Sequence, residues 1–225
     1  MSYPKLIVFD FHGTLSLASG SEKSPILLGD FETSLKLGEF TLIKLNNLKN
    51  ALRPYKNGDW YSAMQKSNID PFIMMPTLKD VILFVDDMRH HRKDVIFSIA
   101  SMLEDEKFMY DMMRYCFESQ GKISPFLQEA IISSHSLNRM MSKGKDDKWP
   151  HISVILERMK LSVDKSDIVL IDDSENVVSY MSRNGVCSIL VQDYFRLTDW
   201  NKGCFVELET ESNNDILKLL SRFRK

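Results

Sequence analysis

Four short, mostly hydrophobic runs stand out along the chain, each bounded by polar residues. They cover residues 6–9, 94–101, 167–171 and 186–191. Apolar runs of this length, rich in valine, isoleucine and phenylalanine, are typical of strands that are buried on both faces. The first run ends at Asp10, and the third ends at Asp172 and Asp173. We therefore expect buried strands, two of which carry acidic side chains at their ends.

Between these runs the apolar positions recur every three or four residues, the period of a helix that packs on one face. Residues 77–91 are the clearest case, with Leu78, Val81, Val85 and Met88 on one stripe. Three further helices are predicted at residues 106–118, 152–159 and 174–184. Strands that alternate with helices predict an α/β fold, a three-layer, Rossmann-like parallel sheet with helices on both faces.

The segment after the first strand breaks this alternation. It begins with a polar stretch containing serine and glycine, and it is then punctuated by prolines. Two helices are predicted in it, near residues 39–53 and 59–67, and a closing amphipathic helix is predicted at 214–223. We interpret the segment as a small helical cap or flap inserted after the first strand. The expected boundaries are residues 1–19 and 76–225 for the core and 20–75 for the insertion.

Composition narrows the class of protein. Hydrophobic residues make up 44% and charged residues 27% of the 225 residues, as in ordinary globular proteins. The net charge of −2 and the pI near 6.2 disfavour nucleic acid and anionic membranes as partners. Cys116, Cys187 and Cys204 are too widely spaced for a zinc site or a disulfide framework. With no leader-like or membrane-length apolar stretch, we expect a cytosolic or nuclear protein of undetermined oligomeric state.

Polar residues that could bind a ligand or take part in catalysis follow several of the predicted strands. Ligands of such folds bind at the carboxyl ends of the strands, where Asp10, Ser101 and the Asp172/Asp173 pair lie. Lys148 stands in a lysine-containing loop before the helix that leads into the third strand. Each residue alone has an ordinary explanation, as a turn former, a helix cap or a solvated lysine. Their joint occurrence in this order favours a functional site.

This joint pattern resembles the haloacid dehalogenase-like (HAD) superfamily. Residues 10–14, Asp-Phe-His-Gly-Thr, are similar to its first motif, D-x-D-G-T, and Ser101 to its second. Lys148 is the best candidate for the third motif, with Lys143 and Lys145 as alternatives in the same loop, and Asp172-Asp173 resemble the fourth. The resemblance covers roughly residues 5–16 and 76–192, and its local texture is most similar to the magnesium-dependent phosphatase branch.

The resemblance implies a Mg²⁺ cofactor. Its ligands would be a carboxylate oxygen of Asp10, the backbone carbonyl of His12 and the Asp172/Asp173 pair, with Asp173 as the better direct ligand and Asp172 acting through water. Sequence alone leaves open which of the two carboxylates ligates directly. Oxygen ligands suit Mg²⁺ rather than zinc, and the cation would offset the repulsion between a carboxylate and a dianionic phosphate.

The same resemblance implies a reaction. Asp10 would attack a phosphate monoester and form an aspartyl-phosphate that water later hydrolyses. Lys148 would hold both Asp10 and the phosphate, while Ser101 and the backbone amides of Phe11 and His12 would bind the phosphate oxygens. The expected partner is a small-molecule or protein phosphate ester.

His12 departs from the family pattern, which has an aspartate there to protonate the leaving group and then activate water. Histidine can do both, because its ordinary pKa of about 6.5 lies near working pH. Three readings stay open: a phosphatase with His12 as acid and base, a slow or altered phosphotransferase, and a binding module that uses the insertion. A nucleic-acid 3′-phosphatase is a further alternative, although Asp146 and Asp147 dilute the positive charge of the lysine-containing loop.

Three other groups have more ordinary interpretations. His90-His91-Arg92 ends a predicted helix, where positive charge complements the helix dipole. The methionines of residues 109–113 are expected in the core. Trp60 and Tyr61 are expected to pack within the insertion rather than stack on a substrate.

Overall fold

The computed structural model describes residues 4–16, 52–53, 59–102, 105–134, 137, 146–191 and 195. Its centre is a sheet of five parallel strands in the order β3-β2-β1-β4-β5. The strands are β1 (Leu6–Phe9), β2 (Ile96–Ser101), β3 (Phe126–Ser133), β4 (Ile168–Asp172) and β5 (Cys187–Leu190). The predicted α/β, Rossmann-like fold with a parallel sheet is confirmed.

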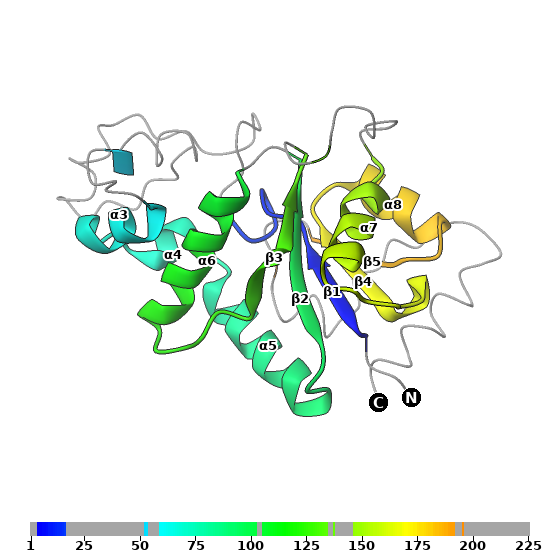
Figure 1. Cartoon of the computed structure of the whole chain (residues 1–225), viewed down its shortest axis with the longest axis horizontal. Helices are drawn as coiled ribbons and strands as arrows, with labels where there is room; N and C mark the ends of the chain where they lie inside the picture. Colours follow the sequence, from blue (N-terminus) through cyan, green and yellow to red (C-terminus); the bar gives the residue numbers. More distant parts are fainter. Residues whose placement is uncertain are drawn as a thin grey trace.

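Helices cover both faces of this sheet, as Figure 1 shows. The four long ones are α5 (Leu78–His91), α6 (Glu106–Ser119), α7 (Trp149–Arg158) and α8 (Glu175–Arg183). Alternate residues of β1 serve the two faces: Ile7 and Phe9 enter a core with α5 and α6, whereas Leu6 and Val8 enter a core with α7 and α8. Side chains of a strand alternate between faces, so a strand with a helical layer on each side needs a continuous apolar run.

The third strand, β3, is the main element that the hydrophobic pattern did not predict. It lies at the edge of the sheet, and Leu127, Gln128 and Glu129 are exposed where its pairing with β2 is irregular. An edge strand needs fewer apolar residues than a central one, so only its first residue and its last four are buried. The predicted helix over 152–159 begins three residues earlier, with Pro150 in the first turn, a position where a missing backbone N–H costs nothing.

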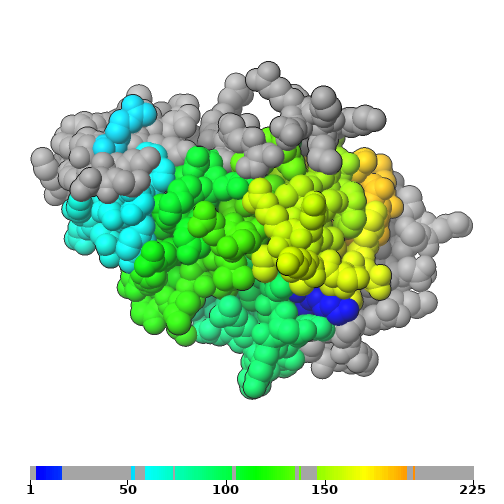
Figure 2. All heavy atoms as spheres, in the orientation of Figure 1, coloured from blue at the N-terminus to red at the C-terminus, as the bar shows by residue number. Residues whose placement is uncertain are grey.

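Two short helices from the predicted insertion pack beside α6. They are α3 (Trp60–Ser67), which confirms the helix predicted near 59–67, and α4 (Pro71–Met74). Figure 2 shows this segment in cyan against the green surface of α6. The helices predicted at 39–53 and 214–223 lie outside the described residues, apart from Leu52 and Arg53. The boundaries of the insertion stay a prediction.

The remaining local predictions concern packing. Met109, Met112 and Met113 are fully buried in the core, as expected. Trp60 and Tyr61 pack against the core edge-on to the rings of Phe108 and Tyr115 respectively. Among the described helices, none has the length and hydropathy that a membrane span requires.

Candidate active site

The topology of the sheet brings Asp10 and Asp172 together. Phe9 on β1 is in register with Ile171 on β4, and the backbone N–H of Asp10 donates to the carbonyl of Ile171 at 2.8 Å. Asp10 and Asp172, each one residue further on, therefore emerge side by side at the carboxyl edge of the sheet. The chain passes from β1 to β2 and β3 on one side and returns to β4 on the other. This is the topological switch point, where open α/β sheets bind their ligands.

Lys148 reaches this point from the start of α7. Its side chain is almost completely buried, with 1% of the residue exposed. The ammonium group forms an ion pair with Asp10, donates to the carbonyl of Ala100 at 2.6 Å and lies 3.5 Å from Asp172 Oδ2. Burial by itself lowers the pKa of this lysine, but the negative charges of Asp10 and Asp172 outweigh it and leave the pKa raised. Lys148 therefore stays charged beside Asp10.

The three carboxylates of the site are crowded; Asp10 and Asp172 are buried, whereas Asp173 is exposed at the rim. Burial raises the pKa of Asp10, against the opposing effect of the Lys148 ammonium. The pKa of Asp172 is raised to about 6, chiefly by burial, and that of Asp173 to about 6, by burial and by the charge of Asp172. One lysine thus faces three acidic groups, and the site holds an excess of negative charge.

The arrangement fits a hard divalent cation such as Mg²⁺. One carboxylate oxygen from each of Asp10, Asp172 and Asp173 lies within 4.8 Å of the other two. Asp172 Oδ1 accepts a hydrogen bond from the backbone N–H of Ser174 at 2.9 Å, whereas its buried Oδ2 receives none from the described residues. The Lys148 ammonium faces Oδ2 at 3.5 Å but also pairs with Asp10, so it offsets the charge of the three carboxylates only in part, and a divalent cation would offset the rest. The donor set is all oxygen, which suits Mg²⁺ rather than zinc.

The loop after β1 carries His12 next to these carboxylates. Gly13 has a φ of +77°, and a Cβ built on it would meet the carboxylate of Asp173. Only glycine fits both the left-handed backbone and this close approach. His12, partly buried, pairs through its backbone with Ser16, so that residues 12–16 form a tight loop. Gly13 thus allows the carboxylate of Asp173 to lie close to the loop that carries His12.

Ser101 and a neighbouring histidine complete the described part of the site. Ser101 is buried at the end of β2, directly after the Ala100 carbonyl that Lys148 binds. His151 lies one helical turn after Lys148 on α7, and its Nε2 is 3.0 Å from the hydroxyl of Ser134, whose backbone N–H donates to the Ser101 carbonyl. Burial and the charge of Lys148 lower the pKa of His151 to about 4. The sequence alone assigned His151 no functional role, although its spacing of three residues from Lys148 indicates that both lie on one face of α7.

The structure thus gathers most of the residues that the motifs predicted. Asp10, Lys148, Asp172 and Asp173 lie together, and His12 and Ser101 lie at the same edge of the sheet. The side chain of Phe11 is buried in the core, so only its backbone can serve a ligand. The alternatives Lys143 and Lys145, together with Arg139, lie outside the described residues.

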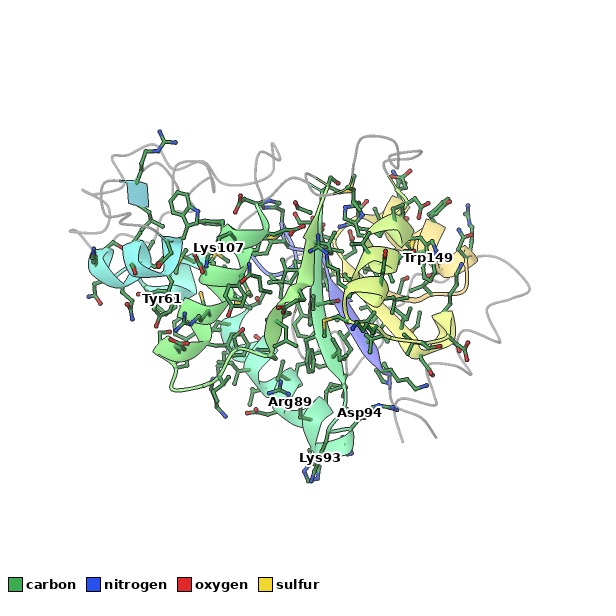
Figure 3. The ribbon with its side chains drawn as sticks, in the orientation of Figure 1. Tyr61, Arg89, Lys93, Asp94, Lys107 and Trp149 are labelled. Atoms are coloured by element: carbon green, nitrogen blue, oxygen red, sulfur yellow. The ribbon has the colours of Figure 1, made fainter. Side chains whose placement is uncertain are left out.

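The basic end of α5 does not belong to this site. Arg89, His90 and His91 occupy the last turn of the helix, as the dipole argument predicts. The turn that follows leads into the first residue of β2, and so it lies at the opposite edge of the sheet from Asp10. Figure 3 shows the labelled Arg89, Lys93 and Asp94 at this end of the molecule.

No family model and no curated protein matches the chain. Among solved structures, a HAD hydrolase of family IA, variant 3, from Entamoeba histolytica is 15% identical with a TM-score of 0.47, over 96% of this chain and 99% of that chain. A candidate phosphatase from Clostridium difficile is 16% identical with a TM-score of 0.43, over 96% of this chain and 100% of that chain. A HAD-superfamily hydrolase of subfamily IA, variant 1, from Geobacter sulfurreducens is 15% identical with a TM-score of 0.39, over 96% of both chains. Two of these three similar structures carry the name of the HAD superfamily.

Proposed function

We propose that the chain is a Mg²⁺-dependent phosphomonoester hydrolase that acts through an aspartyl-phosphate on Asp10. One observation carries the proposal: a buried lysine is paired with Asp10 at the switch point of the sheet, with Asp172 and Asp173 close by. A structural ion pair needs one carboxylate for one lysine. Three clustered carboxylates around one lysine destabilise a folded chain, and such groups are typical of functional sites.

The residues present can divide the chemistry among themselves. The carboxylate of Asp10 attacks phosphorus, and its new bond forms as the bond to the ester oxygen breaks. Lys148 favours the ionised form of Asp10, against the effect of burial, and faces the incoming phosphate oxygens with a positive charge. Ser101 and the backbone N–H groups after Asp10 donate to the same oxygens. Water later attacks the aspartyl-phosphate and releases inorganic phosphate and free Asp10.

The metal would be held by Asp10, the His12 carbonyl and the acidic pair, with Asp173 as the direct ligand and Asp172 acting through water. Bound Mg²⁺ supplies positive charge that offsets the repulsion between the dianionic ester and the attacking carboxylate. The substrate we expect is a phosphate ester of a small molecule or a protein.

We assign the proton transfers to His12. The imidazolium gives its proton to the departing ester oxygen, and the neutral imidazole then takes a proton from the attacking water. Its place in the loop two residues after Asp10 supports this assignment, because both proton transfers occur beside the carboxylate that carries the phosphoryl group.

The test is phosphate release from a generic aryl phosphate and a broad panel of phosphate esters, with and without added Mg²⁺. We expect turnover only with Mg²⁺, and a loss on the order of 10⁴-fold or more in kcat for Asp10→Asn, because the nucleophile is gone. Asp94→Asn is the matched control, since it makes the same chemical change at an exposed site on the opposite edge of the sheet. If Mg²⁺ binds but no ester is turned over, the proposal is wrong and the reading as a binding module is favoured.

A further inference from the structure

The hydroxyl of Thr77 forms a hydrogen bond outside the helix that Thr77 precedes. Thr77 is the N-cap of α5 and is 2% exposed. A threonine at this position ordinarily accepts a hydrogen bond from a backbone N–H in the first turn of its own helix. Thr77 makes no such bond, and its hydroxyl instead donates to the backbone carbonyl of Leu15 at 3.0 Å, 62 residues earlier in the chain. The Thr77 hydroxyl therefore binds the segment around Leu15 instead of capping α5.

That segment is the loop that carries His12 and Gly13. Within the loop, the carbonyl of Phe11 accepts from the backbone N–H groups of Leu15 and Ser16, at 3.0 and 2.9 Å, and from the hydroxyl of Ser16 at 3.2 Å. The backbone N–H of Gly13 donates to the carbonyl of Ser16 at 3.0 Å. These bonds set the shape of the loop, but all of them are internal to it. From outside the loop, the backbone N–H of Phe195 donates to the carbonyl of Thr14 at 2.9 Å, and the Thr77 hydroxyl adds a side-chain bond to the carbonyl of Leu15.

The segment that leads up to Thr77 is fastened to the core at several points. The carboxylate of Asp111 on α6 accepts from the backbone N–H of Trp60 at 3.0 Å, and the hydroxyl of Tyr115 donates to the carbonyl of Ile69 at 2.6 Å. Tyr61 is bonded to Glu118 on α6. Figure 3 shows the labelled Tyr61 from α3 on the side of the molecule where Lys107 projects from α6. The segment that precedes Thr77 is therefore held against α6 by several hydrogen bonds.

We infer that Thr77 is a positioning residue, whose buried hydroxyl fixes the 11–16 loop, and with it His12, relative to Asp10. The same bond joins the end of the described segment 4–16 to the residue that precedes α5. Loss of this donor would leave a buried carbonyl without a hydrogen bond, which costs free energy, so the bond favours this position of the loop. The catalytic part of this inference rests on the proposed function, whereas the structural part does not.

A pair of substitutions separates the hydroxyl from the shape of the side chain. Thr77→Val keeps the branched shape and removes the donor, and Thr77→Ser keeps the donor and removes a methyl group. In the metal-free protein we expect backbone amide exchange at Gly13, Leu15 and Ser16 to rise about tenfold in the valine variant, through local opening, and to change little in the serine variant. Unchanged exchange in the valine variant would overturn the inference, and so would an equal rise throughout the chain in both variants.

Kinetics on an aryl phosphate provide the second readout. Misplacement of His12 lowers kcat on the order of tenfold in Thr77→Val. KM changes less than kcat, because Lys148 and Ser101 still bind the phosphate although the backbone N–H groups of the loop are displaced, and Thr77→Ser restores most of kcat. An equal loss in both variants would refute the positioning role. Should the wild type hydrolyse no ester, the proposed function fails, and amide exchange alone decides the role of Thr77.

Discussion

The sharpest chemical question at the scale of single residues concerns His12, where the related motif has an aspartate. If the imidazolium protonates the leaving oxygen, its removal matters most for esters whose leaving group is a poor one. We expect His12→Asn to lower kcat by roughly 10² to 10⁴-fold for an alkyl phosphate and far less for a nitrophenyl phosphate, whose leaving group departs without a proton.

The measurement is the dependence of kcat on leaving-group pKa for the wild type and the variant. A steeper dependence in His12→Asn supports the acid role. An equal loss for every ester would mean that His12 only shapes the loop or serves the later attack by water. His12→Asp belongs in the same series. A higher kcat than the wild type would mean that histidine is the poorer acid and base at this position, and a lower kcat would mean that the site is adapted to histidine.

His151 makes a second prediction at this scale, on stability. The residue is 2% exposed, and its pKa in the folded chain is about 4, below the ordinary 6.5. A histidine whose folded pKa is lowered contributes stability that is fully present above pH 6.5 and is lost as the pH falls toward 4, because the unfolded chain binds the proton more readily. We expect at most about 3 kcal/mol from this group over that window.

The check compares free energies of unfolding in urea for the wild type and His151→Gln between pH 4.5 and 7.5. The difference between the two proteins should shrink as the pH falls, and the other titrating groups largely cancel in it. A difference that stays constant across this range would show that the imidazole is not held neutral by its surroundings.

At the scale of elements, α6 is the support for the short helices. Asp111 is 1% exposed, accepts from the first backbone N–H of α3 and forms an ion pair with Lys107 at 2.6 Å. Asp111→Ala leaves that N–H buried without an acceptor and should lower the free energy of unfolding by about 2 to 3 kcal/mol. Asp111→Asn keeps an acceptor oxygen and should cost less. Equal losses in the two variants, measured in urea, would indicate that the charge rather than the hydrogen bond holds α3.

Elements also show what the sequence could and could not predict. The strands β1 and β4 were predictable, because central strands need continuous apolar runs, and so was the meeting of Asp10 with Asp172 at their ends. The edge strand β3 was not, because exposed residues interrupt its apolar pattern. The bond from Thr77 to Leu15 was beyond sequence reasoning, since an N-cap threonine normally serves its own helix and no local pattern marks a partner 62 residues away.

At the scale of the whole molecule, the acidic site couples stability to metal and pH. The pKa values of Asp172 and Asp173 are both raised to about 6, so both carboxylates are mostly ionised at pH 7.5 and mostly protonated at pH 5. Mg²⁺ binds the ionised form and therefore competes with protons. A ligand that binds only the folded chain raises the free energy of unfolding by an amount that grows with the logarithm of its concentration relative to Kd. We expect added Mg²⁺ to raise the melting temperature at pH 7.5 and to raise it much less at pH 5.

Asp173→Asn separates the effect of charge repulsion in the metal-free protein from the effect of Mg²⁺ binding. Removal of one crowded negative charge should raise the melting temperature of the metal-free protein at pH 7.5 and abolish most of the shift with Mg²⁺. Asp164→Asn is the matched control, because Asp164 is an exposed carboxylate that precedes β4 at the opposite edge of the sheet, and this variant should respond to Mg²⁺ as the wild type does. A Mg²⁺ shift that persists in Asp173→Asn, or that is as large at pH 5 as at pH 7.5, would place the cation elsewhere. The negative charge that makes the metal-free site unfavourable is, on this account, the source of its affinity for the metal.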